Sequence, residues 1–91
     1  MYSPDDLKDM TQEQAQEAFD ALAQGFYRTA RWKTEFARGS GVTSTAVNRW
    51  FSDGTPPAWA FMLLQSWVQR DAALHQLRKV RDAIAFTEAL D

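Results

Sequence analysis

Residues 33–50 read KTEFARGSGVTSTAVNRW, a pattern typical of two short helices that cross around a tight turn. Such a crossing needs a small residue where the two helices touch, and Ala37 supplies it. Four residues later, Gly41 can take a positive φ in the turn without steric cost. Four apolar positions are spaced to point back into a core: Phe36, Val42, Val47 and Trp50. The stretch therefore predicts a helix-turn-helix over about residues 32–52.

The second helix of this pair is expected over residues 44–51. Thr43 or Ser44 is suited to cap its start, because a hydroxyl there accepts a hydrogen bond from a free backbone N–H. Its end is expected at Ser52-Asp53-Gly54, where Gly54 is free to take a positive φ. The outward positions between its apolar anchors all carry hydrogen-bonding side chains: Ser44, Thr45, Asn48 and Arg49.

Residues 15–68 resemble the Cro/phage-repressor family of helix-turn-helix transcriptional regulators, most closely over residues 32–54. WKTEFAR at 32–38 and VNRWFSDGTPP at 47–57 look like small bacterial or prophage members. Ser40 departs from the family pattern, which usually has an apolar residue just before the turn glycine. The resemblance implies an all-α, compact, four- to five-helix, lambda-repressor-like DNA-binding domain spanning residues 1–91.

In that family the second helix of the pair lies in the major groove of double-stranded DNA. The resemblance therefore assigns base contacts to Ser44, Thr45, Asn48 and Arg49. Arg49 is suited to guanine and Asn48 to adenine, and the methyl group of Thr45 to thymine. For Ser44 the alternative is a cap with no base contact, and for Asn48 and Arg49 it is an ordinary solvated position.

The resemblance also places Lys33 and Thr43 at phosphate-contacting positions. Thr55 is added because the start of the next helix offers free backbone N–H groups to a phosphate. Arg38 is expected to support phosphate binding electrostatically.

Charge is unevenly distributed along the chain, whose net charge is −2. Residues 25–50 carry five basic side chains and one acidic side chain, a net charge of +4. Residues 1–24 carry −5 and residues 51–91 carry −1. Positive charge is thus concentrated where a phosphate-facing surface needs it, although a solvated basic face without a partner is the alternative.

Helices are expected throughout the chain. Ser3 and Pro4 are suited to begin a short extra turn, and Thr11 with Gln14 has the form of a capping box that starts a longer helix. A further helix is predicted over residues 32–38, ending before Gly39-Ser40-Gly41. Pro57 is the expected first position of the helix that follows.

Residues 58–91 contain neither glycine nor proline, so they form one long helix or two helices separated near Asp71. The C-terminal segment, about residues 71–91, carries an apolar stripe bordered by Phe86. The stripe is a candidate homodimer surface, made of Leu74, Leu77, Val80 and Ile84. The alternative is that it folds back and covers Phe19 and Phe26.

Several classes of protein are disfavoured by composition. The chain has no cysteine and only one histidine, His75, so no catalytic residues, metal ligands or cofactor-binding residues are predicted, and an enzyme is not expected. The N-terminal residues lack the pattern of a signal peptide, and no apolar run is long enough to span a membrane. The expected location is the cytoplasm of a bacterial or phage-infected cell. The four tryptophans are expected in the core rather than stacked on single-stranded bases: Trp32, Trp50, Trp59 and Trp67.

The sequence thus predicts a sequence-specific DNA-binding transcriptional regulator, a repressor, that binds an inverted repeat as a homodimer. One alternative is an oligomeric DNA-recognition subunit of a packaging machine, similar to a small terminase. A second is a protein-interaction module that uses the same fold without DNA.

Overall fold

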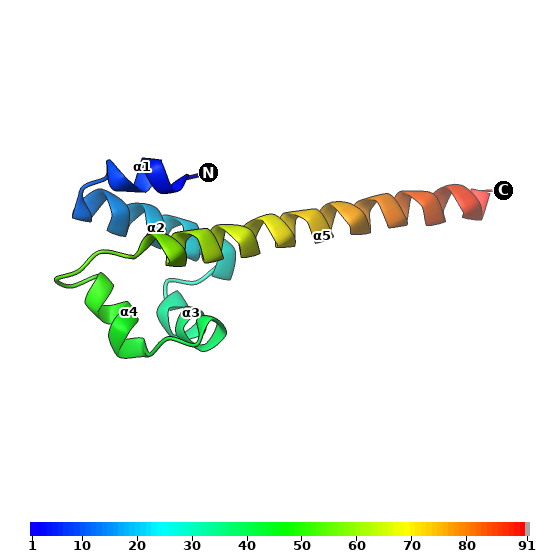
Figure 1. Cartoon of the computed structure of the whole chain (residues 1–91). Helices are drawn as coiled ribbons and strands as arrows, with labels where there is room; N and C mark the ends of the chain where they lie inside the picture. Colours follow the sequence, from blue (N-terminus) through cyan, green and yellow to red (C-terminus); the bar gives the residue numbers. More distant parts are fainter. Residues whose placement is uncertain (91) are drawn as a thin grey trace.

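The computed structural model describes the backbone of residues 1–90 and the side chains of residues 1–86. Over that part of the chain the fold is all-α, with five helices and no strand (Figure 1). The helices are α1 (Pro4–Lys8), α2 (Gln12–Tyr27), α3 (Trp32–Ser40), α4 (Ser44–Trp50) and α5 (Ala58–Leu90). We call residues 1–70, which hold the first four helices and the start of α5, the compact unit. The rest of α5 projects away from it (Figure 1).

The first two helices begin where their capping residues predict. Ser3 accepts a hydrogen bond from the Asp6 N–H, and Pro4 occupies the first helical position. Thr11 and Gln14 form the predicted capping box, with bonds of 3.0 and 3.1 Å. These bonds satisfy backbone donors that a helix start otherwise leaves free.

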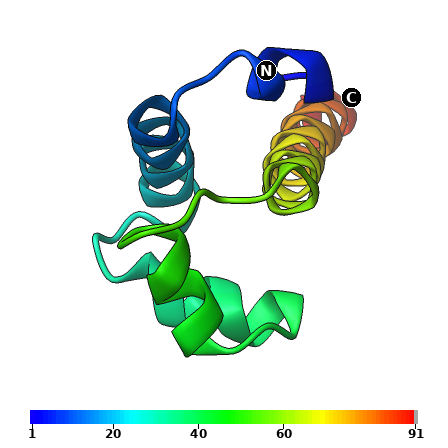
Figure 2. The ribbon, with the colours of Figure 1, turned by 60° about the vertical axis from the view of Figure 1, so that its left-hand side comes forward.

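Phe19 of α2 lies at the centre of the core and is fully buried. Its ring centroid lies 5.0–6.3 Å from those of five other aromatic residues: Trp32, Phe36, Trp50, Phe51 and Phe61. Edge-on and tilted aromatic pairs at these distances each contribute about 0.5–1.5 kcal/mol beyond the burial of their area. This cluster joins α2, α3 and α5 to α4 and to Phe51, just beyond the end of α4. Figure 2 shows the ribbon of these helices, with α3 and α4 lying below α2 and the start of α5.

Two polar contacts fix the periphery of the core. The Nε1–H of buried Trp32 donates to Asp20 Oδ1 at 2.7 Å, which satisfies the one polar atom of its side chain. Gln65 of α5 accepts from the Tyr2 N–H at 2.6 Å and donates to the Tyr2 carbonyl at 2.9 Å. Gln65 is itself buried, so this pair of bonds attaches the N-terminal segment to α5.

One continuous helix covers residues 58–90, so Asp71 does not cap a restart. Every described side chain from Asp71 to Phe86 is exposed. The alternative in which this segment folds back over Phe19 and Phe26 is therefore wrong. Phe26 instead stacks on Trp67, with 6.5 Å between the ring centroids.

Helix α3 extends through Gly39 to Ser40, two residues beyond the predicted end. A Cβ at Gly39 would lie in van der Waals contact with Cη2 of Trp67, at 3.4 Å. The helix ends instead where Gly41 takes the left-handed conformation, since a single glycine in the last turn costs too little to stop it earlier. The hydroxyl of Ser40, the position that departs from the family pattern, lies 3.5 Å from the Ala37 carbonyl and from the Val42 N–H.

Other predicted details after α4 also need correction. Helix α4 ends at Trp50, with Phe51 as its C-cap, and α5 begins at Ala58 rather than Pro57. Gly54 does not adopt a positive φ. The Gly54 N–H donates to the Arg49 carbonyl at 2.9 Å, and glycine is favoured there because a Cβ would lie only 3.0 Å from that oxygen.

Trp59 is the one tryptophan that does not enter the core, since it is 48% exposed and touches Trp50 edge-on. Trp32 is fully buried, while Trp50 and Trp67 are half-buried against the core.

Candidate nucleic-acid interface

The turn between α3 and α4 has the predicted geometry. Gly41 has φ 82°, and its N–H donates to the Ala37 carbonyl at 3.0 Å. Ala37 is buried, as expected for the small residue at a close crossing of two helices. Phe36 and Val47 are fully buried on either side of the turn. The core therefore fixes the angle at which α4 leaves α3.

Thr43 caps the start of α4. Its Oγ1 accepts from the Ala46 N–H at 3.1 Å, and its carbonyl accepts from the Val47 N–H at 3.2 Å. Of the two predicted caps, Thr43 is thus the one observed. Because Ser44 is not the cap, its hydroxyl is not used by the helix.

The outer face of α4 carries the four predicted base-contacting residues, all of them exposed: Ser44, Thr45, Asn48 and Arg49. Thr45 and Arg49 lie about 160° around the helix from buried Val47, while Asn48 lies about 100° and Ser44 about 60° from it. Across residues 1–86, no hydrogen bond or ion pair engages any of these four side chains. The donors and acceptors of this face are therefore available to a partner.

Two glutamines of α2 hold the other end of α4. Gln16 Nε2 donates to the carbonyls of Trp50 and Gly54, both at 2.9 Å, and Gln12 Nε2 donates to the Gly54 carbonyl at 2.8 Å. A helix leaves its last carbonyls without partners, and here one of them is satisfied by a side chain 34 residues away. We call Gln12 and Gln16 the glutamine clamp. Sequence reasoning missed it, because polar residues near the start of α2 carry no local signal for such a contact.

The four predicted phosphate-contacting residues are not equivalent. The Nζ of Lys33 lies 4.9 Å from the ring centroid of Phe51, a cation–π contact that places it near the end of α4. Arg38 is exposed and forms an ion pair with Glu35 at 3.6 Å. Thr43 is exposed at the opposite end of α4. Thr55 lies three residues before α5, so a helix N-terminus no longer supports its assignment.

Most basic side chains around α3 and α4, all but Arg38, are free of acidic partners in the described part of the chain. In the described part of the chain the ion pairs are Lys8–Asp5 and Arg38–Glu35, both solvent-exposed. Arg28, Arg31 and Arg49 form no ion pair within residues 1–86 and are exposed. Cations in this state can pair with an external anion without first breaking an internal contact.

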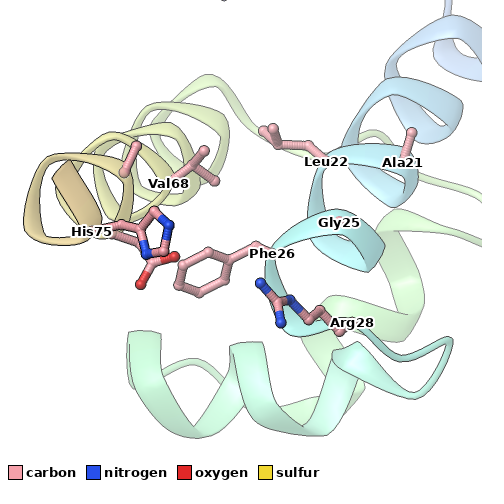
Figure 3. A pocket seen from close by; sticks show the side chains of 9 residues that line it. Ala21, Leu22, Gly25, Phe26, Arg28, Val68 and His75 are labelled. Carbon is pink, nitrogen blue, oxygen red and sulfur yellow. The ribbon is translucent and has the colours of Figure 1, made fainter. Parts of the chain in front are cut away.

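A separate groove of about 380 Å³ lies between α2 and α5 (Figure 3). Leu22 and Phe26 enter it from α2, Val68 and His75 from α5, and Arg28 lies at its edge. None of the α4 face residues lines this groove. Among the residues that the structure describes, no cluster of His, Cys, Asp or Glu is suited to hold a metal ion.

No described helix is long and apolar enough to cross a membrane. The chain matches no protein-family model, no curated protein and no solved structure. What it does must therefore be argued from the geometry of its own surfaces.

Proposed function

We propose that the protein is a sequence-specific transcriptional regulator that inserts α4 into the major groove of double-stranded DNA. The observation that carries this proposal is the outer face of α4. Four exposed hydrogen-bonding side chains stand on it without internal partners, and both ends of the helix are fixed by side-chain hydrogen bonds. A face that is already in place for binding does not need to be ordered when the partner arrives.

The chemistry of this face suits base edges. The major groove is about 12 Å wide and admits an α-helix, and it shows a different pattern of donors and acceptors for each base pair. The guanidinium of Arg49 fits O6 and N7 of guanine, and the amide of Asn48 fits N6 and N7 of adenine. Thr45 offers a methyl group to thymine, and Ser44 a hydroxyl to either kind of base.

Phosphate contacts supply the part of the affinity that does not depend on sequence. Lys33 and Thr43, near opposite ends of α4, are the side chains we assign to phosphates on either side of the groove. Arg38 is a further candidate, although it would have to leave Glu35, an exposed pair that costs little to break. We keep Thr55 as the weakest member of this set.

We propose repression as the mode of regulation, because a bound protein blocks a site by occupancy alone. Two copies of the chain, paired through α5, would read the two halves of an inverted repeat. A two-fold protein dimer matches the symmetry of such an operator.

The test is a titration on duplex DNA selected from a randomised pool, with random duplex as the reference. We expect Asn48→Ala and Arg49→Ala each to reduce the preference for the selected sequence by about 1–3 kcal/mol. Arg78→Ala, which removes an exposed arginine from the projecting part of α5, is the matched control and should keep the preference.

Two results would contradict the proposal. One is unchanged discrimination in both α4 variants. The other is an affinity that does not fall between about 50 and 200 mM salt, where phosphate contacts predict a loss of orders of magnitude. The second result would favour a protein-interaction module instead.

A further inference from the structure

The apolar residues of helix α5 lie on one side of the helix in its first half and mainly on the opposite side in its second half. Before Val68 its buried apolar residues, Ala60, Phe61 and Leu64, face the core. At about 100° per residue, the positions between Val68 and Phe86 that continue the direction of Leu64 to within about 40° are all polar or charged. These are Asp71, His75, Arg78 and Asp82. The side of α5 that packs on α2 thus has no apolar residue in line with Leu64 between Val68 and Phe86.

A second apolar line begins on the opposite side of the helix. Its members follow each other at intervals of four, three and four residues: Ala73, Leu77, Val80 and Ile84. They lie about 140–180° around the helix from Leu64. Leu77, Val80 and Ile84 are 64, 56 and 54% exposed. We call these four residues the outer seam.

Two neighbouring apolar residues do not belong to the outer seam. Leu74 borders a hollow beside Phe26 and Trp67, so it belongs to the edge of the compact unit. Phe86 lies about 120–180° around the helix from Leu77, Val80 and Ile84. The outer seam is therefore narrower than the apolar stripe expected from the sequence, because it includes neither Leu74 nor Phe86.

We infer that the outer seam binds the outer seam of a second copy of this chain, as a two-stranded coiled coil. Alternating steps of three and four residues are the repeat by which one helix packs along another. An isolated helix in water is marginal without such packing, and beyond His75, which still lines the groove against α2, the helix runs free of the other helices (Figure 1). A line of this kind on a two-fold dimer is complementary to its own copy.

Charge argues for a second copy rather than a membrane surface. Helices that lie on anionic membranes carry a strongly basic polar face. The side of α5 opposite the outer seam mixes both signs, with Asp71 and Asp82 beside Arg78. Such a mixed face is suited to water.

This pairing adds a mode of assembly to the proposed function. It rests on that function only for the claim that the dimer binds DNA. The seam lies beyond the compact unit, so the dimer would join two compact units through their projecting helices. The faces of α4 stay uncovered and available to two half-sites.

The test is the mass of the full chain in solution without DNA, measured by sedimentation at about 1–100 µM. We expect twice the chain mass for the wild type. Leu77→Glu/Ile84→Glu should weaken the dimer at least ~100-fold, because four buried apolar side chains per dimer become charged. Phe86→Glu is the matched control, since Phe86 is 67% exposed but lies off the seam, and it should remain a dimer. Circular dichroism checks that each variant keeps its helices.

A wild-type chain that is monomeric at about 100 µM would overturn the inference, and so would an assembly of eight or more copies, which favours a packaging ring. A Phe86→Glu chain as monomeric as the double variant would also overturn it. Because no DNA is present, a failure here is distinct from a failure of DNA recognition. The Asn48→Ala and Arg49→Ala variants should keep the dimer mass.

Discussion

Leu64 and Leu77 are the same residue type on the same helix, yet Leu64 is fully buried and Leu77 is 64% exposed. Leu64 lies in the compact unit, where α5 packs on the aromatic core around Phe19. Leu77 lies in the projecting part, where no other helix of the chain reaches it (Figure 1). The comparison shows that helix formation and burial are separate events in this protein. Both leucines are helical, and whether each side chain is buried depends on what lies alongside.

The largest effect we expect comes from Phe19→Ala, which removes the ring shared by five aromatic contacts. Phe→Ala changes in a core cost about 3–5 kcal/mol, a large part of the stability of a domain of this size. Phe86→Ala, in the projecting part, should change the free energy of unfolding by no more than ~0.5 kcal/mol. Chemical denaturation followed by circular dichroism measures both, and equal losses would show that the two regions do not differ in packing.

Smaller effects on the free energy of unfolding are expected from substituting two glycines of the compact unit whose backbone conformations differ. Gly41→Ala should destabilise the chain by about 1–2 kcal/mol, because an alanine at φ 82° brings its Cβ against its own backbone. Gly25→Ala should instead stabilise it by up to about 1 kcal/mol, since Gly25 is helical and a Cβ there meets nothing within 4 Å. Thermal unfolding reports both signs. A neutral Gly41→Ala would argue against the turn that sets the angle of α4.

The smallest effect concerns pH and is confined to the N-terminal end of the compact unit. The Ser3 N–H, at 2.8 Å, and the Ser3 hydroxyl lower the pKa of Asp6 below its usual value of 3.8. The charged carboxylate therefore stabilises the fold above the usual pKa, and this contribution is lost as the pH falls through the lowered one.

An NMR titration of the Asp6 side chain measures this shift. Ser3→Ala keeps the backbone N–H and removes the hydroxyl, so it should return the Asp6 pKa only part of the way. An Asp6 pKa at or above 3.8 in the wild type would contradict the capping box of α1.

Much of the fold follows from signals that act over a few residues. Thr11 with Gln14 and Ser3 with Pro4 mark the starts of α2 and α1, and Gly41 marks the turn. The exposed face of α4 follows from the same local rules, because the spacing of its apolar anchors leaves the other side outward. Whether that face reads DNA remains the proposal that the titrations test.

Other features depend on contacts between distant parts of the chain. The glutamine clamp joins residues 34–42 positions apart. The exposure of Trp59 likewise reflects its position outside the core, although its residue type predicts burial.

The amino-acid sequence by itself determined where the first four helices begin, where the chain turns between α3 and α4, and which side chains α4 turns outward. These depend on hydrogen bonds and backbone preferences among near neighbours. The tertiary structure alone decided that α5 is one helix, that it leaves the compact unit after about residue 70, and that its second apolar line faces away from the core. The reason is that the burial of a helix face requires a surface to cover it, and α2 ends at Tyr27, before it could cover the later turns of α5.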